Sequence, residues 1–118
     1  MYQQQICRAI RAKKNVLIKY DYDVLDRTFS PHILFYFGND KRSVAGIQVG
    51  NPAEPSERTV WRSFTLERIT SLGKADSTFS VDTKFDHSDK RYRSRVVCHV
   101  SRYRSYPRVA DRQPAVIG

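Results

Sequence analysis

The chain has 118 residues and a formal net charge of +9 at pH 7, and its length fits a single domain. Its residues are 40% hydrophobic and 12% aromatic, which is too apolar for a wholly disordered chain and too interrupted by charge for a transmembrane protein. The amino end lacks the uninterrupted apolar stretch of a secretory signal, and Cys7 and Cys98 do not have the spacing of a zinc site. We therefore expect a protein of the reducing cytoplasm that makes no contact with a membrane.

Apolar periodicity defines the first elements of the chain. Residues 2–14 place apolar side chains at helical spacing, which predicts a short amphipathic helix that ends at Asn15. Apolar and charged residues then alternate over residues 16–22, as in a strand with one buried face. Residues 28–37 contain a continuous apolar run, typical of a strand covered on both faces, and Pro31 places an irregularity or an edge near its start.

Turn signals separate the remaining strands. Gly38-Asn39-Asp40 predicts a hairpin, and the returning strand covers residues 42–49. A polar loop with two prolines follows at residues 50–57. Two further strands are predicted over residues 59–66 and 69–72, with a short bend between them.

One helix followed by five short strands with tight connections predicts a mainly β fold. Five short strands lose their open edges best when the sheet closes on itself, so we expect a small five-stranded antiparallel barrel of the SH3-like or Sm-like type with an amino-terminal α-helix. This domain would occupy residues 1–80, and residues 81–118 would form a basic carboxy-terminal extension rich in arginine and tyrosine.

The positive charge is concentrated in that extension. Residues 1–89 hold 13 Lys+Arg and 11 Asp+Glu, whereas residues 90–118 hold eight basic side chains and one acid. Arginines there alternate with Tyr92, Tyr103 and Tyr106, and a tract of this kind can hold phosphates and stack on unpaired bases. The alternative is a solvated tail whose charge only prevents aggregation.

Several segments of the chain resemble the WYL domain of bacterial regulators. The most specific of them is the pattern Arg-x-Phe-x-Leu-Glu-Arg-Ile at residues 62–69, and the match covers roughly residues 5–80. The position of the namesake Trp-Tyr-Leu tripeptide is taken by Arg42-Ser43-Val44. The other matching segments are Ala9-Ile10-Arg11, residues 16–20, Phe29-Ser30-Pro31, residues 46–50 and Thr78-Phe79.

The resemblance implies an Sm-like barrel preceded by a helix, which serves as a ligand-sensing or nucleic-acid-binding module. Such domains usually belong to transcription factors that also carry a helix-turn-helix, and some bind single-stranded DNA or RNA. Only about 15 residues precede the first predicted strand, too few for the two helices of that motif. We therefore expect the domain to act through another protein rather than by direct operator binding.

Two arginines of the most specific stretch are the leading ligand-binding candidates. Arg62 shares strand parity with Phe64, which directs its side chain toward the barrel. A guanidinium there needs a carboxylate, backbone carbonyls, solvent or an anionic ligand. Arg68 matches the second arginine of the family, which the resemblance places near the same ligand surface. The alternatives are that Arg62 reaches out to solvent or pairs with Glu67, and that Arg68 forms an ion pair with a neighbouring acid.

Five more residues are candidates for the rim of the same site. Tyr20, His32 and Tyr36 would offer stacking planes and hydrogen-bond donors to a base or nucleotide. Core packing with a satisfied polar tip is the commoner role for such residues, most clearly for His32. Arg42 and Gln48 share one side of the returning strand. Their alternative role is to keep an exposed edge strand soluble.

The sequence offers little for catalysis. Asp82, Asp86, His87 and Asp89 form an oxygen-rich cluster, but their spacing fits no calcium-binding loop, so no metal is expected. The sequence contains no Gly-x-Ser-x-Gly elbow, P-loop or His-Glu-x-x-His motif. Cys7 is expected to be a small core residue. We expect neither enzymatic activity nor a cofactor.

The leading hypothesis is a WYL-like regulatory binding module. Its basic barrel rim, centred on Arg62 and Arg68, would bind single-stranded nucleic acid or a nucleotide-type anionic ligand. The alternative is a non-enzymatic interaction domain, in which the helix and a sheet edge form a homodimer or dock on a transcriptional or defence regulator.

Overall fold

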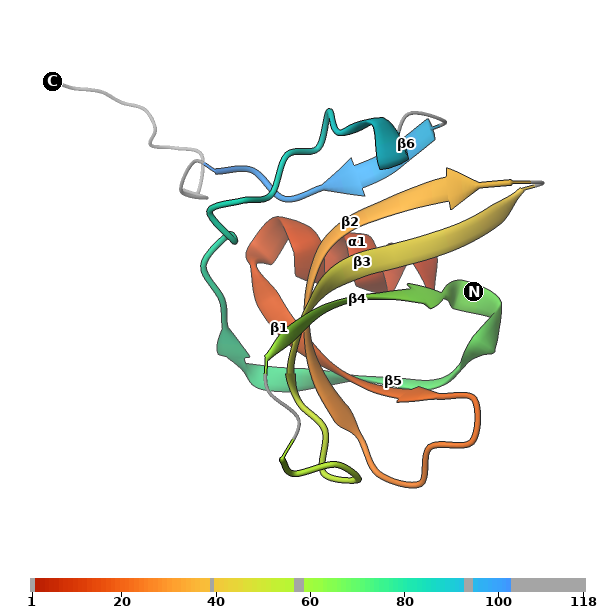
Figure 1. Cartoon of the computed structure of the whole chain (residues 1–118), viewed down its shortest axis with the longest axis vertical. Coiled ribbons are helices and arrows are strands. Elements are labelled where there is room, and N and C mark those ends of the chain that lie inside the picture. Colours follow the sequence, from red (N-terminus) through yellow and green to blue (C-terminus); the bar gives the residue numbers. More distant parts are fainter. Residues whose placement is uncertain (1, 39, 57–58, 93–94, 103–118) are drawn as a thin grey trace, which may run out of the picture.

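The computed structural model describes residues 2–38, 40–56, 59–92 and 95–102. It contains a helix, six strands and two short 3-10 turns (Figure 1). In chain order these are α1 (Gln3–Ala12), β1 (Lys14–Tyr20), β2 (Arg27–Phe37), β3 (Lys41–Gly50), β4 (Val60–Thr65), η1 (Leu66–Arg68), β5 (Ile69–Thr78), η2 (Lys90–Tyr92) and β6 (Arg95–His99).

All six strands belong to one antiparallel sheet. Strands β4, β3, β2, β1 and β5 follow one another in that order, and β6 pairs with β2. The predicted mainly β class with an amino-terminal helix is therefore confirmed, but the predicted count of five strands is one short. Within the described residues no ladder joins β4 to β5, so the sheet is open between these two strands.

Strand β2 changes its partner on one side, and Pro31 lies at the change. Residues 27–29 pair with β1, whereas residues 33–36 pair with β6. Proline has no N–H group to donate to a ladder, so it fits the gap between the two partners. On the other side, Gly46 of β3 lies so close to β2 that an added Cβ would be 2.0 Å from the carbonyl oxygen of Ser30. This close approach accompanies the bend of β2 and β3 seen in Figure 1.

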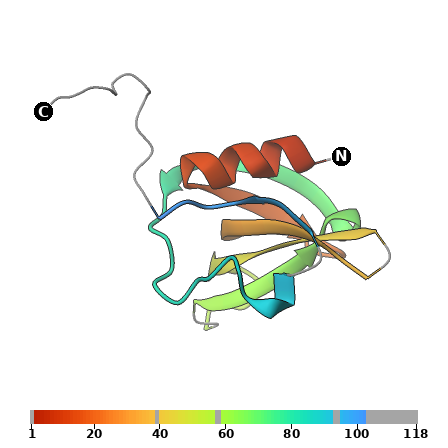
Figure 2. The same ribbon diagram turned by 90° about the horizontal axis from the view of Figure 1, so that it is seen from above.

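Helix α1 covers one side of the sheet and is tied to β6. Its apolar stripe buries Ile6, Cys7 and Ile10. The helix ends at Ala12 and is capped by Lys13, whose φ of 54° is in the left-handed region. Cys7 and Cys98 form a disulfide with their Cα atoms 5.9 Å apart. The sequence alone predicts no bond between these two cysteines. Figure 2 shows α1 along one side of the molecule and η2 toward the opposite side.

The first part of the predicted extension packs against the sheet. Phe85, Tyr92 and Val100 are buried in the core, and the N–H group of Val100 donates to the carbonyl oxygen of His32 at 2.8 Å. The remainder of the basic tract, residues 103–118, lies outside the described residues. In the part of the chain that the structure describes, no helix has the length and apolar character needed to cross a membrane.

Candidate functional site

Arg68 lies at the end of η1, where an acid of the β1–β2 loop holds it. Its Nε donates to Asp21 Oδ1 at 2.8 Å, and its Nη2 donates to the other oxygen of the same carboxylate. The guanidinium also lies over the ring of Tyr20, 5.0 Å from the centroid. The ion pair that the sequence left as the alternative for Arg68 is therefore present, although the side chain is exposed to solvent.

Arg42 is also bound by groups of the protein itself. Its Nη1 donates to Gln3 Oε1 at 3.0 Å, and its Nη2 lies 3.5 Å from Glu67 Oε2. Glu67, which the sequence offered as a partner for Arg62, thus pairs with Arg42. Tyr36 faces Arg42 across the β2–β3 ladder, and the guanidinium of Arg95 lies 4.1 Å from the centroid of its ring.

Gln48 is buried rather than exposed on an edge strand, so the solubility role considered for it is wrong. Its Oε1 accepts a hydrogen bond from Arg27 Nη1 at 3.0 Å. Arg27 also binds Asp23 through two bonds of 2.7 and 3.0 Å, and Asp23 accepts the backbone N–H of Tyr20. The bond from Arg27 lowers the pKa of Asp23 from its ordinary value, against the opposing effect of burial.

His32 is a core residue. Its side chain is fully buried and stacks on Phe79 with 4.9 Å between ring centroids. Its Nε2 accepts the backbone N–H of Asp82 at 3.0 Å, so Nδ1 carries the proton and donates to the carbonyl oxygen of Ser30 at 2.9 Å. Burial lowers the pKa of His32, which keeps the imidazole neutral. The core role that the sequence favoured for His32 is the one observed.

Arg62 lies in the middle of β4. The β3–β4 ladder places Arg62 opposite Gly46 and Phe64 opposite Val44, so Arg62 and Phe64 share one face of the sheet. The side chain of Arg62 is half-buried. The structure thus brings Tyr20 to Arg68, and Tyr36 to Arg42, while His32 and Gln48 are enclosed in the core.

A groove between α1 and strands β1 and β5 presents a different arrangement of charge. It has a volume of about 510 Å³, and the exposed cations Arg8, Lys14 and Lys74 line it together with Asp76. Small residues form part of its wall, namely Ala9, Ala12, Gly73 and Ala75. Within the described residues, none of the three cations takes part in an ion pair.

The sequence did not predict this groove. It also did not predict which acids bind Arg42 and Arg68, which are Glu67 and Asp21. Arg8 and Lys14 lie on the polar side of the predicted helix, which was the only signal for the groove. Asp21 reaches Arg68 from a left-handed position with φ of 53°, which no periodic pattern reveals. Across the described ranges, no three His, Cys, Asp or Glu side chains gather closely enough to hold a metal ion, and this includes the segment from Asp82 to Asp89.

The chain was compared with family models, curated proteins and solved structures. No family model, no curated protein and no solved structure matches the chain. The resemblance to the WYL domain therefore rests on the sequence segments quoted above.

Proposed function

We propose that the chain is a WYL-like, non-catalytic binding module with an SH3-like or Sm-like barrel that binds single-stranded nucleic acid. A hydrogen bond between the end of β4 and β1 supports the barrel, and a second bond extends the pairing of β1 with β5. The N–H of Thr65 donates to the hydroxyl of Tyr20 at 3.0 Å, and the N–H of Asp21 donates to the carbonyl oxygen of Arg68 at 2.9 Å. The first of these bonds ties the end of β4 to β1, although within the described residues no strand ladder joins the two strands.

The observation that carries the proposal is the charge of the groove between α1 and β5. An anion at Arg68 or Arg42 competes with a carboxylate that already binds the guanidinium. A phosphate at Arg8, Lys14 or Lys74 displaces only solvent and loosely held counterions, so its binding is favoured by their release. The groove therefore replaces the barrel rim as the main phosphate-binding surface of the proposal.

The lining of the groove also suggests how the strand is recognised. Among the described residues that line it none is aromatic, and they offer no platform on which a base could stack. Contacts to the phosphate backbone position a strand without reading its sequence. We therefore expect binding with weak sequence preference and strong dependence on salt. Tyr20, Tyr36 and Arg62 remain the part of the predicted rim from which a base contact would come.

The test is the affinity for a labelled single-stranded oligonucleotide as salt is raised from about 50 to about 200 mM. Loss of three phosphate contacts should make the slope of log affinity against log salt shallower by about 2. The groove variant is Arg8→Gln/Lys14→Gln/Lys74→Gln, and the control, Lys41→Gln/Lys84→Gln/Lys90→Gln, removes equal charge from exposed positions elsewhere. An equal change in both variants contradicts a groove site. If only Arg62→Gln weakens the affinity for the oligonucleotide, the binding site lies at the rim rather than in the groove.

The β1–β2 loop favours protein interaction as a second candidate function. Its apolar side chains point to solvent, with exposed fractions of 97% for Tyr22, 81% for Val24 and 52% for Leu25. Its acids turn inward: Asp21 binds Arg68, Asp23 binds Arg27 and Asp26 binds Lys19. A loop braced in this way presents a fixed apolar tip, and such exposed patches mark interaction surfaces.

Sedimentation over a range of protein concentrations tests the homodimer form of this candidate. If the loop forms the dimer contact, Tyr22→Ser/Leu25→Ser should shift the protein toward monomer at every concentration. A sedimentation coefficient that stays that of a monomer at all concentrations of the unsubstituted protein contradicts a dimer.

A further inference from the structure

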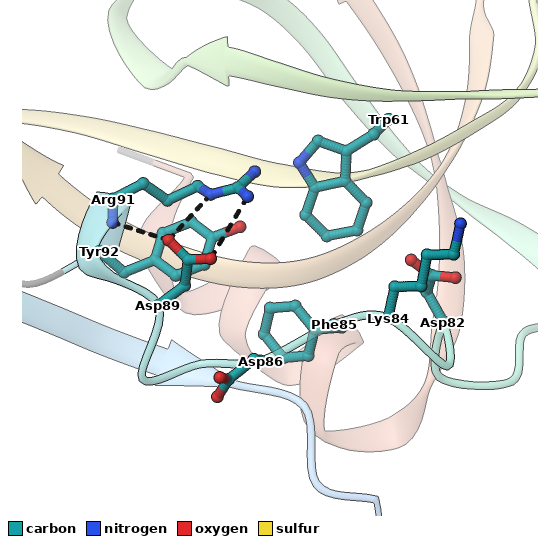
Figure 3. A pocket seen from close by; sticks show the side chains of 8 residues that line it. All are labelled: Trp61, Asp82, Lys84, Phe85, Asp86, Asp89, Arg91 and Tyr92. Carbon is teal, nitrogen blue, oxygen red and sulfur yellow. Dashed lines mark hydrogen bonds and ion pairs between the residues drawn. The ribbon is translucent and has the colours of Figure 1, made fainter.

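A second cavity lies on the opposite face of β4 from Arg62, where the segment that follows β5 packs on the sheet. Its walls are the half-buried ring of Trp61 and the buried rings of Phe85 and Tyr92. The rings of Trp61 and Phe85 are 6.0 Å apart between centroids, and those of Phe85 and Tyr92 are 6.2 Å apart. Figure 3 shows the rings of Trp61 and Phe85 facing each other, with Tyr92 to one side of them.

Acids outnumber bases around this cavity, although the chain as a whole carries +9. Asp89 and Arg91 occupy one end and bind each other, with Arg91 Nε 3.2 Å from Asp89 Oδ1 (Figure 3). Their charges therefore compensate. The other charged side chains that line the cavity are Asp82, Asp86 and Lys84, which leave a net charge of −1. A net negative charge attracts a cation to the cavity and repels an anion.

The aromatic walls already accept one cation of the protein itself. The guanidinium of Arg91 lies 5.6 Å from the ring centroid of Tyr92, within the range at which the ring quadrupole attracts a positive charge. Trp61 offers the aromatic side chain with the strongest attraction of this kind, and part of it remains accessible from solvent. The cavity volume of about 180 Å³ corresponds to about six water molecules.

From this combination we propose that the cavity bounded by Trp61, Phe85 and Tyr92 binds a methylated ammonium group. Such a cation is large and has no or few N–H donors to satisfy, so aromatic faces replace its hydration better than they replace that of a bare ammonium. Asp82 and Asp86 supply the neighbouring negative charge. The group can belong to a free quaternary amine or to a methylated lysine side chain of a protein. The inference is independent of nucleic-acid binding in the groove.

Trp61 is the single tryptophan of the chain, so tryptophan fluorescence, excited selectively over tyrosine, reports on this cavity. The experiment titrates the full chain with choline and with its uncharged isostere 3,3-dimethylbutan-1-ol. We expect a saturable change with choline and affinity for the isostere about tenfold weaker. Equal affinity for the two compounds, or no saturable change with choline, contradicts the proposal.

Two further arms sharpen this test. Asp82→Asn should weaken choline binding about threefold to tenfold, whereas Asp76→Asn makes the same charge change in the groove and should leave it unaltered. Equal effects of the two substitutions contradict a local site. A trimethyllysine peptide that binds tighter than choline, with no binding of the unmethylated peptide, assigns the group to a protein side chain. Binding of choline without that preference assigns it to a free amine.

Discussion

The neutral imidazole of His32 makes the stability of the fold depend on pH. Burial lowers the pKa of His32 from its ordinary value of 6.5, because the charged form would lose its hydration in the core. The unfolded chain therefore binds a proton at a higher pH than the folded chain does. The stability that His32 contributes is present above pH 6.5 and is lost as the pH falls below that value.

We expect the free energy of unfolding to fall as the pH drops below about 6.5, by at most about 1.4 kcal/mol per pH unit. Urea unfolding followed by circular dichroism measures this dependence. His32→Gln should flatten the curve in this interval, whatever its effect on the stability at neutral pH, and His99→Gln serves as the histidine control. A His32→Gln curve as steep as that of the unsubstituted protein contradicts the assignment.

At the scale of elements, the alternating and helical patterns located both ends of α1 and of each strand from β1 to β4 to within two residues. The patterns fail where a strand has no single buried face. The second half of β5 is largely exposed, so the predicted strand stopped at Leu72 instead of Thr78. Strand β6 is short and lies in a tract dominated by arginine, so the sequence pattern of a strand is not evident there. The disulfide that anchors it depends on tertiary contact, which spacing in the sequence does not reveal.

The candidate site was less predictable than the fold. Strand parity correctly placed Arg62 on the face of Phe64, because alternation depends only on the strand. The partners of Arg68 and Arg42 depend on where loops and turns direct Asp21 and Glu67, and periodicity carries no information about that direction. Groove cations are brought together by the packing of α1 beside β5, which is likewise a tertiary property.

Because β2 and β3 approach closely at Gly46, adding a single methyl group there should destabilise the fold. Gly46→Ala places a Cβ against the backbone oxygen of Ser30, and backbone cannot move aside as a flexible side chain can. We expect a loss of about 1–3 kcal/mol in the free energy of unfolding, measured with urea. Gly73→Ala is the matched control, because its nearest neighbour is Leu17 Cβ at 4.0 Å. Equal effects of the two substitutions contradict the close contact.

At the scale of the whole molecule, one covalent link joins the first helix to the last strand. The disulfide between Cys7 and Cys98 spans a sequence separation of 91, and closing a loop of that length removes entropy from the unfolded chain. Disulfides persist in oxidising compartments, whereas the composition favoured a reducing, cytoplasmic one. The oxidation state of this pair in the cell therefore decides between the two settings.

We expect Cys7→Ser/Cys98→Ser to lower the free energy of unfolding by about 2–5 kcal/mol. Reducing agent should lower the urea midpoint of the unsubstituted protein toward that of the double variant and should leave the variant unchanged. A midpoint of the unsubstituted protein that does not respond to complete reduction contradicts a stabilising link between α1 and β6.

The distribution of ion pairs over the whole molecule underlies the proposed function. The protein's own acids bind Arg27, Arg42 and Arg68. The groove cations Arg8, Lys14 and Lys74 are exposed to solvent. The most direct measurement is the difference in salt dependence between the groove variant and its charge-matched control when each binds the same single-stranded oligonucleotide. We expect a slope shallower by about 2 for substitution of Arg8, Lys14 and Lys74, with the control close to the unsubstituted protein. Slopes that coincide for the two variants would contradict it.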